Sequence, residues 1–126
     1  MARLLGVFVD ALAAAGASTP TDIPRGPDFF RFSHDGEFAT LLRGAGLRGV
    51  TVETIAFGYR LASADELWNG VLGGSVRMAA LIRRQPVETQ DRIRAEFDRL
   101  VAEYRAPDGL EIPVSVKLAA GRNRHT

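Results

Sequence analysis

Side chains that could carry out catalysis or hold a metal ion are few in this chain of 126 residues. It has no cysteine, which excludes disulfides, thiolate catalysis and zinc sites built on cysteine. Its two histidines, His34 and His125, lie far apart and have no partner at metal-ligand spacing. His34 stands next to Asp35 and could act as a general base, but a histidine at a helix start is more commonly solvated. No residue is therefore assigned to catalysis or to a metal.

Bulky apolar side chains are better candidates for a binding role than the ionisable ones. Four of them, Phe57, Tyr59, Trp68 and Met78, could line a pocket for a flat apolar substrate. Their spacing is equally typical of core positions on a strand and a helix, and this second interpretation is favoured. The sequence therefore leaves an apolar small-molecule site as an alternative to a simple core.

Composition limits the partners that the chain can have. Hydrophobic residues make up 46%, charged residues 25%, and the formal net charge is +1. This charge gives no strong field for nucleic acid or an anionic membrane, and no segment approaches the roughly 20 apolar residues of a membrane span. The apolar N-terminus loosely resembles a signal peptide, but Asp10 interrupts it. We expect a helix over residues 3–15, a cytoplasmic protein, and neither a nucleic-acid nor a membrane partner.

Residues 16–62 predict a loop, a short helix and a strand. Prolines and glycines mark 16–31 as a loop, and the cluster Phe29, Phe30 and Phe32 is expected to anchor it to a core. Ser33 is the expected cap of the next helix, which Gly44 and Gly46 end. The β-branched run 50–55 then predicts a strand, which Phe57 and Tyr59 extend.

Two helices are expected between residues 63 and 105. Ser63 and Glu66 form a capping box, and apolar residues keep helical spacing from there to Ile82. Three glycines, at 70, 73 and 74, interrupt this pattern, so either the helix bends there or a helix or ligand packs close to its backbone. Pro86 suits the first turn of the second helix. The charged run 90–96 on that helix is interpreted as a solvated face.

The clearest alternation of apolar and polar residues runs from Leu110 to Leu118 and predicts the last strand. Pro113 has no amide hydrogen, so regular pairing is expected to begin after it. Residues 121–126 are expected to form a frayed basic tail. Three basic residues in a tail are weak support for a nucleic-acid site.

The order of these pieces resembles the C-terminal part of a class I S-adenosylmethionine-dependent methyltransferase. The residues that carry the likeness are Phe30-Arg31-Phe32-Ser33, Leu41-Leu42-Arg43-Gly44-Ala45-Gly46-Leu47, Val50-Thr51-Val52, Pro107-Asp108-Gly109 and the run 113–122. The resemblance implies that 50–59 and 113–120 correspond to the last two strands of that fold. It also implies that the helices of 63–105 correspond to an insertion that some members use as a lid over the methyl acceptor.

The cofactor-binding part of that family has no counterpart here. The family binds the methyl donor with a Gly-rich turn after its first strand, where glycines allow close backbone approach. Gly44-Ala45-Gly46 follows a helix, and Gly73-Gly74 lies within a helical pattern, so neither is such a turn. No residue is therefore assigned to cofactor binding, no cofactor is expected for this chain alone, and S-adenosylmethionine enters only through the resemblance.

The sequence as a whole predicts an α+β fold with a small antiparallel sheet of two main strands and four or so helices. We expect one domain over 1–126, comprising an N-terminal helix and loop (1–32), a helix and strand (33–62), a helical insertion (63–106), the last strand (107–122) and a tail (123–126). Two strands leave open edges, which favours a homodimer or a separately encoded catalytic half as partner. The function expected is a methyltransferase-related lid portion unable to bind the methyl donor alone, so whether the chain is an enzyme stays open. The alternative is a non-enzymatic small-molecule-binding or dimerisation module.

Overall fold

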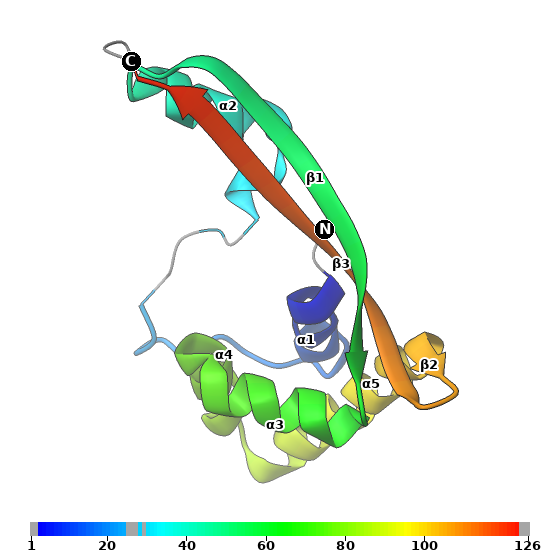
Figure 1. The fold of residues 1–126 in the computed structure, drawn as a ribbon. Helices are drawn as coiled ribbons and strands as arrows, with labels where there is room; N and C mark the ends of the chain where they lie inside the picture. The colour runs from blue at the N-terminus through cyan, green and yellow to red at the C-terminus, as the bar shows by residue number, and fades with distance from the viewer. Residues whose placement is uncertain (1–2, 25–27, 29, 124–126) are drawn as a thin grey trace. The chain divides into compact units, whose positions relative to one another are not determined.

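The computed structural model describes residues 3–24, 28 and 30–123, which form helices and one small sheet (Figure 1). The α-helices in these residues are α1 (Arg3–Ala14), α2 (Asp35–Gly44), α3 (Ala64–Gly74), α4 (Val76–Arg83) and α5 (Val87–Val101). Two 3-10 helices, η1 (Arg31–Ser33) and η2 (Ala102–Tyr104), and three strands, β1 (Arg48–Leu61), β2 (Arg105–Ala106) and β3 (Gly109–Arg122), complete them. The sheet is antiparallel with strand order β1-β3-β2. The predicted α+β class with a small antiparallel sheet is confirmed.

Contacts between residues group the chain into two compact units. The helical unit consists of the described residues within 3–25 and 58–113. The strand unit consists of the described residues within 26–57 and 114–126, and so contains α2 with the adjoining parts of β1 and β3. The expectation of a single domain stays a prediction.

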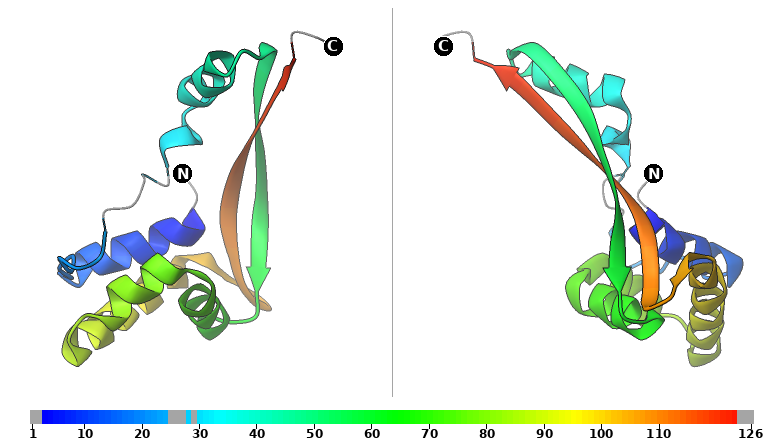
Figure 2. Two further views of the ribbon diagram at one scale, coloured as in Figure 1. Left: turned by 90° about the vertical axis from the view of Figure 1, so that its left-hand side faces the viewer. Right: turned by 45° about the vertical axis from the view of Figure 1, so that its right-hand side comes forward.

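The core of the helical unit lies where α1 packs on α5, with α3 and α4 beside them (Figure 2). Phe8 of α1 and Phe97 of α5 are fully buried, with ring centroids 4.8 Å apart. The sheet contributes Leu61, Leu110 and Ile112 to the same core. Burying one such side chain stabilises the folded state by about 1.5–3 kcal/mol relative to leaving it exposed. This burial holds the helices against this part of the sheet.

The capping box at the start of α3 is confirmed with one change. The Ser63 hydroxyl accepts a hydrogen bond from the Glu66 amide at 3.2 Å. The Glu66 carboxylate in turn accepts from the amide of Ala62 at 2.6 Å, one residue before the cap itself. These two bonds satisfy amides at a helix start that would otherwise lack partners, and they fix the exit of β1 into α3.

The glycine-containing helix expected over 63–82 is interrupted at Ser75. This residue is extended (φ −114°, ψ 102°) and its hydroxyl caps α4 by accepting from the Met78 amide at 3.4 Å. A Cβ built on Gly70, Gly73 or Gly74 would meet nothing within 4 Å. These glycines therefore accompany a break between two helices, and among the described residues nothing packs close to them.

The prediction for Ser33 is wrong. His34 occupies the residue before α2 and its side chain makes no capping bond. The Ser33 hydroxyl instead donates to the carbonyl of Phe30 at 2.5 Å, because Ser33 ends the turn η1 and is bonded back into it. The expected stop is confirmed, since α2 ends at Gly44 and Gly46 takes φ +90°. Of the three aromatic anchors, Phe29 lies outside the described residues, whereas Phe32 packs on Phe38 with centroids 5.9 Å apart.

The prediction that pairing begins after Pro113 is also wrong, because β3 begins at Gly109. Ala106 pairs with Gly109 across a two-residue turn, so Gly109 directs its backbone groups toward β2. Backbone groups alternate in direction along a strand, so the nitrogen of Pro113 points to that same side. There β2 has already ended, and the missing amide hydrogen leaves no partner unsatisfied among the described residues.

The tail expected from residue 121 is shorter than predicted. Gly121 and Arg122 belong to β3, and a Cβ on Gly121 would lie 2.9 Å from the Cβ of Leu47. Glycine, which has no side chain, thus allows the end of β3 to lie close to the residue that precedes β1. Residues 124–126 of the expected tail lie outside the described residues. Within the described ranges, no helix combines the length and apolar character that a bilayer crossing requires.

Candidate functional site

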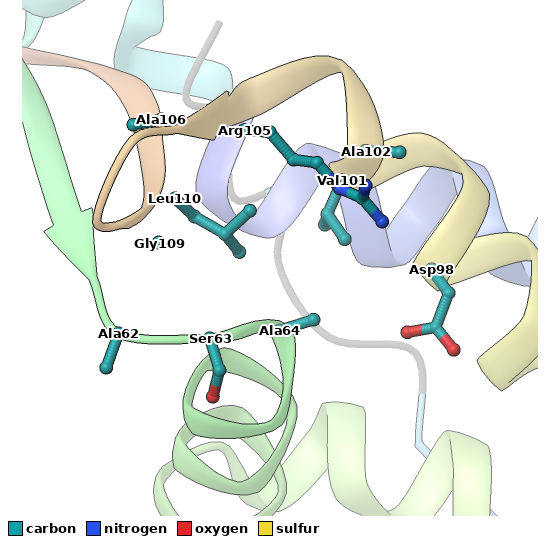
Figure 3. A pocket seen from close by; sticks show the side chains of 10 residues that line it. All are labelled: Ala62, Ser63, Ala64, Asp98, Val101, Ala102, Arg105, Ala106, Gly109 and Leu110. Atoms are coloured by element: carbon teal, nitrogen blue, oxygen red, sulfur yellow. The ribbon is translucent and has the colours of Figure 1, made fainter.

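A cavity of the helical unit has a volume of about 480 Å³ (Figure 3). It lies where the C-terminal end of α5 with η2, the turn between β2 and β3, and the start of α3 come together. Its lining residues are Ala62, Ser63, Ala64, Asp98, Val101, Ala102, Arg105, Ala106, Gly109 and Leu110. This volume falls within the range of about 300–1,000 Å³ that is typical of small-molecule sites.

Two charged side chains of opposite sign line this cavity. Asp98 accepts a hydrogen bond from Nε of Arg94 through Oδ1 at 3.0 Å, and its side chain is 50% exposed. The guanidinium of Arg105 is exposed and forms no hydrogen bond or ion pair within the described part of the chain. Figure 3 shows that the side chains of Leu110, Arg105 and Asp98 come from three different elements around the cavity. The cavity therefore offers an unpaired cation, a partly paired anion and an apolar wall.

Arg94 connects the elements that form the cavity. It bonds both Asp98 of its own helix and Asp65 in the first turn of α3. Its guanidinium also lies over the rings of Trp68 and Phe97, 5.1 and 5.6 Å from their centroids. Burial lowers the pKa of Arg94, but the bonds from Asp65 and Asp98 raise it by more, so its pKa is above its ordinary value. The guanidinium thus stays charged and holds the start of α3 beside α5.

Sequence reasoning missed this role, because it interpreted residues 90–96 as a solvated face. The spacing of Arg94 and Asp98 by four residues was a signal for one of its contacts. Asp65 lies 29 residues away in the sequence, and no spacing rule joins it to Arg94. The contact exists only because α3 and α5 pack together.

The four residues considered for a substrate pocket occupy different environments. Met78 is 5% exposed within the core, and Trp68 is half-buried with its ring stacked on Phe8 at 5.8 Å. Phe57 and Tyr59 lie on β1 and are 47% and 46% exposed. None of the four lines the 480 Å³ cavity. Their role as substrate contacts stays a prediction, and the packing of Trp68 and Met78 is that of core residues.

His34 lies on a second hollow, in the strand unit, with a volume of about 550 Å³. Its side chain is exposed, and the other lining residues come from η1 and from α2. Arg31 and Glu37 of this hollow already pair with each other at 3.5 Å. Among the described residues no polar side chain bonds to His34 and orients its ring. Nothing here assigns it a catalytic role.

The strand unit carries an apolar face on β1 and β3. Lys117 donates to Thr54 and pairs with Asp35 of α2 at 2.8 Å, and Gly121 approaches Val50. The contacts of Lys117 with Thr54 and of Gly121 with Val50 fit the same pairing register of the two strands. These residues therefore lie on one face of the sheet, the face that meets α2. By alternation, the opposite face carries the large apolar residues of the two strands. They are Ile55, Phe57, Val116 and Leu118, exposed by 47%, 47%, 43% and 54%, and we call them the apolar face.

Within the described residues, no three His, Asp or Glu side chains lie close enough to hold a metal ion. A comparison with protein-family models gives no match, and none of the curated proteins compared with the chain matches it. Inferences about function therefore rest on the geometry of the cavity and of the apolar face.

Proposed function

We propose that this chain is the C-terminal, substrate-side portion of a class I S-adenosylmethionine-dependent methyltransferase, and that it acts only together with a Gly-rich cofactor-binding half. The order of its elements supports this. A short helix with a glycine stop, α2, leads into β1, and α3–α5 separate β1 from β3, which lies antiparallel beside it. The resemblance found in the sequence implies this order for the last two strands and a lid between them.

One observation carries the proposal, namely the uncovered apolar face of the strand unit. Beyond Leu110, β3 also has no strand on its second edge among the described residues. An exposed apolar sheet face next to an open edge is a typical interaction surface. The remaining five strands of the parent fold, with their helices, would cover both.

S-adenosylmethionine does not fit the residues present. In the described part of the chain, β1 into α3 is the junction at which a strand leads directly into a helix, and its linking residues are Ala62 and Ser63. Neither is glycine, and the glycines with positive φ, Gly16, Gly46, Gly49 and Gly109, follow helices or lie at strand starts. Without a glycine turn at that junction, the backbone has no cradle for the cofactor. The partner half would have to supply it.

A second candidate function arises from the same apolar face. If a second copy covers it, the chain is a non-enzymatic dimerisation module. An apolar small molecule remains part of this alternative. Under either proposed function, we propose a cytoplasmic location for the chain.

The test combines light scattering with calorimetry. We expect the chain alone to give no saturable heat with S-adenosylhomocysteine. Together with a Gly-rich half encoded beside it, it should form a 1:1 complex that binds this product. The substitutions Phe57→Ser and Leu118→Ser should weaken the complex at least tenfold. Val76→Ser, at a valine that is 90% exposed on α4, is the matched control and should change nothing.

The outcomes separate the two candidates. A homodimer that Phe57→Ser and Leu118→Ser dissociate would favour the dimerisation module. Saturable binding of S-adenosylhomocysteine by the chain alone would contradict the proposed division into halves. A monodisperse monomer at high concentration that forms no complex with a Gly-rich half would refute both.

A further inference from the structure

We propose that the 480 Å³ cavity of the helical unit binds a small zwitterion of the α-amino-acid type, with its carboxylate on Arg105 and its ammonium on Asp98. This inference does not depend on the proposed function, because it is argued only from the side chains that line this cavity.

The charges at the cavity define the ligand. Arg105 has no ion-pair partner among the described residues, and its planar guanidinium suits a carboxylate. The bond from Arg94 uses Oδ1 of Asp98, which leaves Oδ2 with no described partner. A plain carboxylate would be repelled by Asp98, and a plain amine by Arg105. A ligand carrying both charges satisfies both residues.

The remaining wall is apolar and well fixed. Val101 and Leu110 are 2% and 6% exposed and belong to the core, and Ala64 and Ala102 add small side chains beside them. A hydrocarbon side chain of the ligand would contact mainly the two alanines, with the buried Val101 and Leu110 beneath them. The bonds of Arg94 to Asp98 and Asp65 hold Asp98 in place before a ligand arrives, which reduces the ordering cost of binding.

The test is an NMR titration of the labelled chain with three matched probes. L-norleucine carries both charges, hexanoate lacks the ammonium, and hexylamine lacks the carboxylate. We expect L-norleucine to shift the amides of Ala64, Val101 and Leu110 saturably, and the other two probes to bind at least tenfold more weakly. Tenfold corresponds to about 1.4 kcal/mol.

Two substitutions and two controls locate the site. Arg105→Gln and Asp98→Asn should each reduce L-norleucine binding at least tenfold. Arg83→Gln and Asp91→Asn, at exposed positions of α4 and α5 outside the cavity, should leave it unchanged. If Asp98→Asn fails to fold because Arg94 loses a partner, then Arg105→Gln and the three probes on the unaltered chain decide.

The results that overturn the proposal are equally specific. Equal binding of hexanoate and L-norleucine would mean that Asp98 plays no part in recognition. Absence of saturable shifts up to about 10 mM L-norleucine, a concentration well above the usual range for specific small ligands, would remove the site. Shifts confined to the hollow around His34 would place binding elsewhere.

Discussion

Replacing Arg94 with methionine tests whether this one side chain couples α3 to α5. Methionine keeps a flexible apolar stem over Trp68 and Phe97 but removes the charge. The substitution therefore breaks the bonds to Asp65 and Asp98 and the two cation–π contacts, while it preserves most of the packing. We expect the helical unit to lose stability without losing its fold.

The expected loss is set by the exposure of the partners. The side chains of Asp65 and Asp98 are 73% and 50% exposed, so solvent screens both ion pairs. Exposed pairs contribute about 0.3–0.5 kcal/mol each, and the two cation–π contacts, which share one guanidinium, together contribute about 0.5–1 kcal/mol. Arg94→Met should thus lower the free energy of unfolding by roughly 1.5 kcal/mol at low salt. Because salt screens exposed charges, about half of this difference should disappear at ~1 M salt.

Urea unfolding monitored in parallel by circular dichroism and by tryptophan fluorescence provides the assay. Trp68 is the single tryptophan of the chain and lies against Arg94, so its emission reports on this contact directly. Arg83→Met is the control, because Arg83 is an exposed arginine for which the described residues provide no side-chain partner. If the two substitutions destabilise the chain equally, or if the loss at Arg94 is independent of salt, the network does not couple the helices and the reasoning is refuted.

Three further predictions concern the frame of the helical unit. Phe97→Ala should lower the free energy of unfolding by about 3–5 kcal/mol, since the ring is fully buried against Phe8; a loss below about 1 kcal/mol in urea unfolding would contradict this packing. Gly109→Ala should destabilise the chain by more than about 1 kcal/mol, because its φ is +140° and a Cβ would collide with the carbonyl oxygens of Leu61 and Ala62. Gly70→Ala, in open space on α3, should instead stabilise the chain by about 0.5–1 kcal/mol. Thermal unfolding that ranks the two variants the other way would contradict these backbone environments. Ser63→Ala should cost about 1 kcal/mol in the same assay, and no change would mean that its bond to Glu66 contributes nothing.

Local patterns predict the elements that are long and regular. The alternation from Leu110 to Leu118 indicates β3, the β-branched run 50–55 indicates β1, and the capping box locates the start of α3. Each of these signals is contained in a few adjacent residues, so the sequence expresses it directly. The two-residue strand β2 is too short to carry any such pattern, and it forms only because the turn at 107–108 folds it onto β3.

The cavity could not be predicted, because it belongs to no single pattern. Its walls come from the start of α3, the end of α5 and the β2–β3 turn, which are brought together by the packing of the core. In the sequence, Arg105 is only a charged residue after a helix, and Asp98 is only a charged residue on a helix face. Their importance arises from a shared cavity, and that depends on tertiary structure. The sequence instead indicates its aromatic residues as pocket candidates. The size of a side chain can be read from the sequence, whereas which side chains meet in space cannot.

The alternation along β3 is itself a reason to expect a partner for the apolar face. Leu110 and Ile112 in the helical unit are buried, at 6% and 0% exposure, whereas Val116 and Leu118 in the strand unit are about half exposed. The same period of two nevertheless continues through both, and Ile55 and Phe57 repeat it on β1. A strand that faced only water there would gain nothing from large apolar residues and would risk aggregation.

Replacing both Val116 and Leu118 with threonine, which keeps strand propensity, therefore tests the apolar face. The free energy of unfolding of the isolated chain should stay within about 0.5 kcal/mol of its original value, while association with a partner should be abolished. A large loss of stability in the isolated chain would instead mean that this face is covered from within.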